Sequence, residues 1–165
     1  NNRLLVPGQA ATAALGARWL VDEGLGDAPV LIHNVDTVVE GRDLRAVAHD
    51  LAARDGFIDV FDADSPAYSY VRVDAAGVVT EIAEKEPISR LATSGLYGFR
   101  SAAAYLGAYA RTVTAGEHYV SAVYGQMLRE GATLVARLPP PGARTVVLGT
   151  PREYEACCAG HRVTR

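Results

Sequence analysis

Lysine is nearly absent from this sequence. Of its 16 basic residues only Lys85 is a lysine, and all the others are arginines. Arginine carries a wide, flat guanidinium, whereas lysine carries a compact ammonium on a flexible stem, which suits a single phosphate in a narrow pocket. Lys85 is therefore a candidate phosphate ligand. The alternative, which composition alone favours equally, is a chance survivor in a solvated charge cluster with Glu81, Glu84 and Glu86.

Basic excess, long apolar runs and paired cysteines are also missing. The net charge of −3 and pI near 5.8 argue against a nucleic-acid partner. No apolar run approaches the roughly 18 residues of a membrane span, and no signal-peptide pattern is present, so the sequence predicts a cytoplasmic protein without a membrane partner. The adjacent Cys157 and Cys158 suit neither a disulfide framework nor a metal site, and we expect them buried as small hydrophobes.

The length and a hydrophobic content of 49% predict one domain spanning residues 1–165. Glycine and proline punctuation predicts helices and strands in alternation. Helices are expected at 9–22, within 43–56 between an Asp43 cap and a Gly56 stop, at 101–111, at 117–130 and from a Thr150 cap onward. Strands are expected at 29–33, 57–63, 92–99, 132–137 and 145–148, with a hairpin over 68–85.

This order predicts an α/β fold, a three-layer sandwich around a mixed, mostly parallel sheet with an antiparallel hairpin inserted. Short continuous apolar runs such as "VLIH" are typical of buried parallel strands. In such sheets ligands bind beyond the carboxyl ends of strands. The loop after "VLIH" contains Asn34 and Asp36, so Asp36 is a candidate Mg²⁺ ligand, or else only a turn-capping residue.

The ordered stretches "GQAATAAL", "LIHNVD", "EKEPIS", "SGLYGF", "EHYVSAVYGQML" and "LGTPREYE" extend from Gly8 to about Glu155. In combination they resemble the sugar-phosphate nucleotidyltransferases, most closely the branch of capsule and polysaccharide synthesis. The resemblance implies a Rossmann-like fold, as in nucleotide-diphospho-sugar transferases. It also implies a reaction in which a sugar-1-phosphate and a nucleoside triphosphate form a nucleotide sugar with release of pyrophosphate.

The resemblance also assigns roles to individual residues. Asp36 and Lys85 match the catalytic positions, with Asp36 binding Mg²⁺ and Lys85 on the sugar phosphate. The substrate-binding positions, toward base, sugar or phosphate, are Gly8, Asn34, Glu84, Gly95, Tyr97 and Glu117. A homo-oligomer is left open.

Several positions depart from the family pattern. The Gly-rich loop that grips the triphosphate has no counterpart, so we expect the chain to be a fragment of a longer protein. Val147 stands where many members have a second metal-binding Asp. Ser69 replaces a common sugar-pocket glycine, and "YVSAV" replaces a Thr-Asp pair after Glu117.

Two other functions compete with this one. A non-catalytic nucleotide- or sugar-phosphate-binding regulatory module would share the fold and lack the Gly-rich loop. A glycosyltransferase of related architecture would usually use an Asp-x-Asp pair, whereas "NVD" has one Asp, and it leaves "EKEPIS" unexplained.

Overall fold

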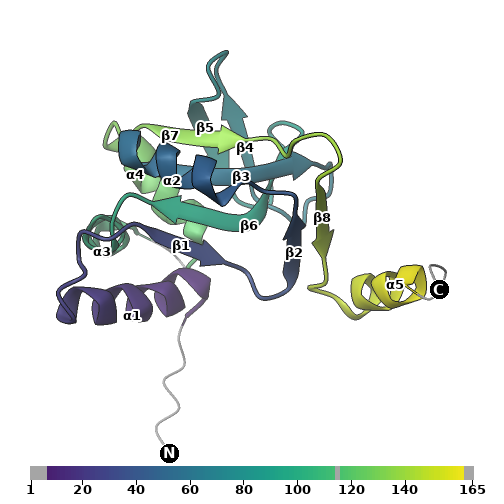
Figure 1. Ribbon diagram of the computed structural model, residues 1–165, viewed down its shortest axis with the longest axis horizontal. Helices are drawn as coiled ribbons and strands as arrows, with labels where there is room; N and C mark the ends of the chain where they lie inside the picture. Colours follow the sequence, from purple (N-terminus) through teal and green to yellow (C-terminus); the bar gives the residue numbers. More distant parts are fainter. Residues whose placement is uncertain (1–6, 114–115, 162–165) are drawn as a thin grey trace, which may run out of the picture.

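The computed structural model describes residues 7–113 and 116–161 (Figure 1). Its helices are α1 (Gln9–Asp22), α2 (Leu44–Ala53), α3 (Ala102–Arg111), α4 (Val120–Arg129) and α5 (Pro151–His161). Its strands are β1 (Val30–His33), β2 (Thr37–Glu40), β3 (Gly56–Asp62), β4 (Tyr70–Val73), β5 (Val79–Ala83), β6 (Leu91–Phe99), β7 (Leu134–Arg137) and β8 (Arg144–Val147). The predicted α/β alternation and the β4–β5 hairpin are confirmed.

The expectation of a mostly parallel sheet is wrong. Six strands form the main sheet. Five follow the order β5-β4-β6-β3-β7, and the sixth, β1, pairs with the same edge of β6 as β4 does. Among these pairs only β3 and β7 run parallel, while β6 runs antiparallel to β1, β3 and β4. The long strand β6 is buried along nearly its whole length, because helices cover both of its faces. Burial on two faces does not determine strand direction. After the β4–β5 hairpin the chain continues directly into β6, which pairs with β3 in the opposite direction. The centre of the sheet is therefore antiparallel.

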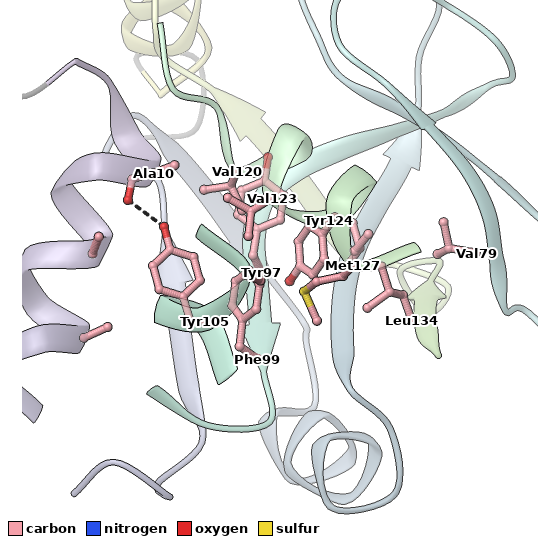
Figure 2. Close-up of a cluster of buried hydrophobic side chains, with 14 of the residues drawn as sticks. Ala10, Val79, Tyr97, Phe99, Tyr105, Val120, Val123, Tyr124, Met127 and Leu134 are labelled. Atoms are coloured by element: carbon pink, nitrogen blue, oxygen red, sulfur yellow. Dashed lines mark hydrogen bonds between the residues drawn. The ribbon is translucent and has the colours of Figure 1, made fainter. Parts of the chain in front are cut away.

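Helices α1, α3 and α4 share the larger hydrophobic core with one face of the sheet. In Figure 2 the rings of Tyr97 and Phe99 on β6 lie between Tyr105 on α3 and Tyr124 on α4. The Phe99 and Tyr124 rings stack with centroids 4.6 Å apart. The Tyr105 hydroxyl donates to the Ala10 carbonyl at 2.6 Å, which ties α3 to the start of α1.

Helix α2 covers the opposite face through a smaller core of Val47, Leu51, Phe57 and Leu96. The Asp43 cap is confirmed, because its carboxylate accepts from the amides of Arg45 and Ala46. The predicted Gly56 stop is wrong, since α2 ends at Ala53 and Gly56 begins β3. A Cβ at Gly56 would lie 2.8 Å from Leu134 Cδ2, so this glycine allows close strand packing instead.

Strands β2 and β8 form a separate antiparallel ribbon beside the main sheet (Figure 1). The predicted loop after β1 thus contains a strand that the sequence did not reveal. The buried Arg42 guanidinium joins the ribbon to the sheet, because it lies 3.0 Å from an Asp59 oxygen on β3 and also donates to the Arg144 carbonyl at 2.9 Å. The ribbon places the segments that follow β1 and β8 next to each other.

Helix α5 begins as predicted, with Thr150 and Glu153 bonded reciprocally. The expectation of buried cysteines is wrong, since Cys157 and Cys158 are both partly exposed on α5. Within residues 7–113 and 116–161, no helix combines the length and apolarity needed to cross a bilayer.

Candidate functional site

A pocket of about 240 Å³ lies beyond the end of β1, between the β4–β5 hairpin, β6, the start of α4 and the segment that leads into α5. Six of the eight predicted site residues line it: Asn34, Asp36, Glu84, Lys85, Gly95 and Tyr97. Further lining residues include Gln9, Thr37, Ser69, Thr93, Tyr119, Val147, Gly149 and Glu153. Segments far apart in sequence therefore converge on one cavity.

Lys85 projects from the end of the hairpin with a left-handed backbone, at φ 55, and is the only non-glycine residue with positive φ in the described chain. This conformation costs a side-chain-bearing residue about 1–2 kcal/mol. Its Nζ donates to the Tyr119 hydroxyl at 2.8 Å and lies 4.8 Å from the centroid of the same ring. The hydrogen bond to Tyr119 is the main cause that raises the pKa of Lys85 above its usual value, so the ammonium stays charged.

Glu84 precedes Lys85 and is half-buried. Its Oε2 accepts hydrogen bonds from Ser121 Oγ on α4, at 2.6 Å, and from Ser69 Oγ next to β4. Both serines are buried, 3% and 9% exposed. Glu84 and Lys85 thus enter the pocket side by side, each held by hydroxyl groups from other elements.

Asp36 lies between β1 and β2, opposite the end of β8. Its carbonyl accepts from the Leu148 amide at 2.7 Å, and Thr37 Oγ1 is 3.4 Å from Oδ1. A Cβ at Gly149 would lie 3.0 Å from Asp36 Oδ2, so the missing side chain leaves space beside this oxygen. Val147 lines the same wall without offering a ligand, and Glu153 is the other carboxylate there.

Asn34 and Gly95 are in direct contact. A Cβ at Gly95, where φ is 87, would lie 2.8 Å from Asn34 Cγ, and the backbone N–H of Asn34 donates to the Gly95 carbonyl at 2.9 Å. The Gln9 side chain donates to Asn34 Oδ1 at 3.2 Å, which links this pair to α1. The glycine therefore serves the packing of Asn34 as well as the shape of the pocket wall.

Gly8 and Glu117 do not line the pocket. A Cβ at Gly8 would lie 2.8 Å from Glu117 Cγ and from His118 N, so the glycine permits close passage of the segment before α4. Glu117 Oε2 accepts from the Tyr119 hydroxyl at 2.5 Å, the hydroxyl that Lys85 contacts. The structure thus links Glu117 to Lys85 through the Tyr119 hydroxyl. The roles assigned to Gly8 and Glu117 in substrate binding stay predictions.

Tyr97 on β6 is a buried residue of the pocket lining. Its hydroxyl lies 3.1 Å from Thr93 Oγ1, and burial is the main cause that raises the pKa of Tyr97 to about 12. The phenol is therefore neutral near pH 7 and can offer a hydrogen bond but no charge.

The pocket lining also contains Gln9, Tyr119 and Glu153, which were not predicted as site residues from the sequence. Tyr119 carried no recognisable signal, because its contact with Lys85 joins residues 34 positions apart. Glu153 was recognised only as part of the helix expected after the Thr150 cap, and Gln9 only as the first residue of a helix.

The residues around Asp36 fit a magnesium ion. A carboxylate beside an open space, in a pocket of oxygen donors, offers the hard ligands that Mg²⁺ prefers. The described residues contain no group of three or more His, Cys, Asp or Glu side chains placed to hold a metal. Mg²⁺ is often held by one or two carboxylates together with substrate phosphates, which is the kind of site that Asp36 could supply.

Comparisons with solved structures show the same fold in sugar-nucleotide enzymes. A nucleoside-diphosphate-sugar pyrophosphorylase from Vibrio cholerae RC9 matches 91% of this chain with 28% identity and a TM-score of 0.72. A Bacillus anthracis protein assigned as a glucose-1-phosphate thymidylyltransferase, solved with a sucrose, matches 98% with 17% identity and a TM-score of 0.75. A UTP-bound UGPase from Acinetobacter baumannii matches 93% with 16% identity and a TM-score of 0.73.

The chain is thus structurally similar to nucleotide-sugar pyrophosphorylases and nucleotidyltransferases over most of its length. It spans 64%, 63% and 56% of those three structures, respectively. No family model and no curated protein matches it.

Proposed function

We propose that this chain is the central and C-terminal part of a nucleotidyltransferase domain that joins a sugar-1-phosphate to a nucleoside triphosphate and releases pyrophosphate. The main observation behind this proposal is that Asp36, Glu84 and Lys85 line one pocket. The fold shared with a nucleoside-diphosphate-sugar pyrophosphorylase supports it. A supply of nucleotide sugars for polysaccharide synthesis is the proposed role.

In the proposed reaction a phosphate oxygen of the sugar-1-phosphate attacks the α-phosphorus of the triphosphate. A new P–O bond forms while the bond from the α-phosphorus to the bridging oxygen breaks, and pyrophosphate leaves with that oxygen. The protein contributes positioning and charge, because phosphoryl-group transfer of this kind needs no covalent protein nucleophile.

Three of the charged groups of the pocket have a task in this reaction. Lys85, held by Tyr119, meets the sugar phosphate and cancels part of its charge. Glu84, held by the two serines, accepts hydrogen bonds from sugar hydroxyls. Asp36 would hold Mg²⁺, which when bound neutralises charge on the triphosphate.

Pyrophosphate release by the full-length protein tests the proposal. Each common nucleoside triphosphate is combined with each of a panel of sugar-1-phosphates in the presence of Mg²⁺. We expect release with one or a few combinations, lost in Lys85→Met and when Mg²⁺ is chelated. Binding of sugar phosphate or triphosphate with no release from any combination would contradict catalysis and indicate a regulatory binding module.

A further inference from the structure

We propose that Ser69 and Ser121 are positioning residues that hold Glu84 so that the pocket selects a sugar phosphate presenting hydrogen-bond donors and carrying no second negative charge. This inference rests on the proposed function and deepens it. It assigns a role to two of the places where the sequence departs from the family pattern, Ser69 and the "YVSAV" stretch that contains Ser121.

The two serines reach the same atom from different elements. Ser69 immediately precedes β4, and Ser121 lies in the first turn of α4, yet both hydroxyls donate to Glu84 Oε2. The Ser69 carbonyl is in turn bonded to the Thr93 amide of β6 at 2.8 Å, so the Ser69 backbone is held by the sheet. The carboxylate is therefore held between the hairpin and a core helix.

This arrangement leaves the second carboxylate oxygen for a ligand. In the described part of the chain, Glu84 Oε1 has no hydrogen-bond partner, and Glu84 lines the pocket. Ser69 also lines the pocket, but its proton is committed to Glu84, so it can offer only lone pairs. Both groups are acceptors, and a matching ligand must bring hydroxyl or amino donors.

The charge of the pocket adds a second restriction. Its lining holds three carboxylates, on Asp36, Glu84 and Glu153, against the one ammonium of Lys85. That ammonium is occupied by the phosphate in the proposed reaction. A further carboxylate on the sugar would face Glu84 with no second protein cation in the lining to balance it, and like charges at close range disfavour binding.

The test compares two probes, glucose-1-phosphate and glucuronic acid-1-phosphate, which differ in a hydroxyl and a carboxylate. Binding of each is measured by calorimetry, together with KM and kcat in the full-length protein. The variants are Ser69→Ala, Ser121→Ala and the double variant, with Ser121→Cys as a variant that keeps the volume and weakens the donor. Ser89→Ala is the matched control, since Ser89 Oγ donates to the Val71 carbonyl at 2.6 Å outside the pocket.

We expect the wild type to bind glucose-1-phosphate at least tenfold more tightly than the glucuronate probe. Each serine variant should weaken glucose-1-phosphate binding by about tenfold, the size of one charge-assisted hydrogen bond. The same variants should raise KM more than they lower kcat and leave the affinity for inorganic phosphate unchanged. The glucose-1-phosphate affinity of Ser121→Cys should lie between those of the wild type and Ser121→Ala. Ser89→Ala should distinguish the two probes as the wild type does.

Equal binding of the two probes by the wild type would overturn the inference and leave the proposed function standing. Serine variants that bind glucose-1-phosphate as the wild type does would also overturn it, as would parallel losses for phosphate and sugar phosphate, which indicate a packing role. A wild type that binds neither sugar phosphates nor triphosphates would overturn the proposed function and this inference with it.

Discussion

The Lys85 ammonium donates a hydrogen bond to the Tyr119 hydroxyl at 2.8 Å, and that hydroxyl donates to Glu117 Oε2 at 2.5 Å. One tyrosine thus links the chain's single lysine to a carboxylate behind it. Although Lys85 is exposed, its strained backbone and the tyrosine ring limit where the ammonium can lie. This geometry supports our proposal that Lys85 is a directed phosphate ligand and not a member of a solvated charge cluster.

Lys85→Arg should lower kcat/KM for the sugar phosphate nearly as much as Lys85→Met, by about 10²-fold or more. A guanidinium keeps the charge but replaces the compact ammonium that contacts Tyr119 with a wide, flat group. The measurement is steady-state kinetics of both variants in the full-length protein with saturating triphosphate. An arginine variant with wild-type rates would support the alternative, in which Lys85 belongs to a solvated charge cluster.

Tyr119→Phe should raise KM for the sugar phosphate about three- to tenfold, because it removes the acceptor of the Lys85 hydrogen bond and keeps the ring. Tyr119→Leu should cost more, since the contact between ammonium and ring face is also lost. Tyr109→Phe is the matched control, because it removes another tyrosine hydroxyl contact of 2.8 Å, to His118, outside the pocket. Equal effects of Tyr119→Phe and Tyr109→Phe would count against a specific role for Tyr119.

Asp36→Asn should abolish most turnover while the midpoint of thermal unfolding stays near the wild-type value. An amide is a far poorer Mg²⁺ ligand than a carboxylate, and Asp36 is exposed at the pocket rather than part of the core. Pyrophosphate release as a function of Mg²⁺ concentration is measured, with Asp22→Asn at the end of α1 as control. Unaltered activity and Mg²⁺ dependence would remove Asp36 from the metal site.

Arg42→Met should destabilise the protein by about 3–5 kcal/mol, because it leaves the buried Asp59 carboxylate without its partner. The two side chains of this pair are 5% and 3% exposed. Arg72→Met is the comparison, since Arg72 and Glu81 are 53% and 47% exposed and such pairs contribute about 0–1 kcal/mol. Urea unfolding measures both free energies, and similar losses would mean that burial does not set the strength of these pairs.

Acid should remove the stabilisation that Glu130 provides. The Arg111 guanidinium and then the Gln126 amide lower the pKa of Glu130 to about 2, from 4.5. Because the folded-state pKa is lowered, the contribution is complete above pH 4.5 and fades as the pH falls toward 2.

The measurement is the difference in thermal midpoint between the wild type and Glu130→Gln, taken at pH 6 and pH 3. This difference should shrink at pH 3 and also at high salt, which screens an exposed pair. Glu155→Gln, which removes an exposed carboxylate from α5, should show no comparable change between the two pH values. A difference that grows on acidification would contradict the assignment.

The candidate site residues were recognisable where they lie in contiguous patterns. Asp36 after "VLIH" and the Glu84-Lys85 pair in "EKEPIS" were identified from the sequence, and the structure places them in one pocket. Tyr119 could not be identified, because nothing local distinguishes a tyrosine that meets a lysine from another hairpin. The serines were visible only as departures from a pattern, and their common target on Glu84 emerged when β4 and α4 were packed together.

Apart from β2, the sequence by itself determined which segments become helices and strands, and it also determined where several of them are capped. These properties follow from apolar periodicity and from side chains that bond within a few residues, as Asp43 and Thr150 do. Strand direction and pairing were decided only in the tertiary structure, because an apolar run buried on both faces packs equally well in either direction. The β2–β8 ribbon and the contacts to Lys85 and Glu84 likewise depend on packing between segments that are distant in sequence. Such packing leaves no signal within a short stretch of residues.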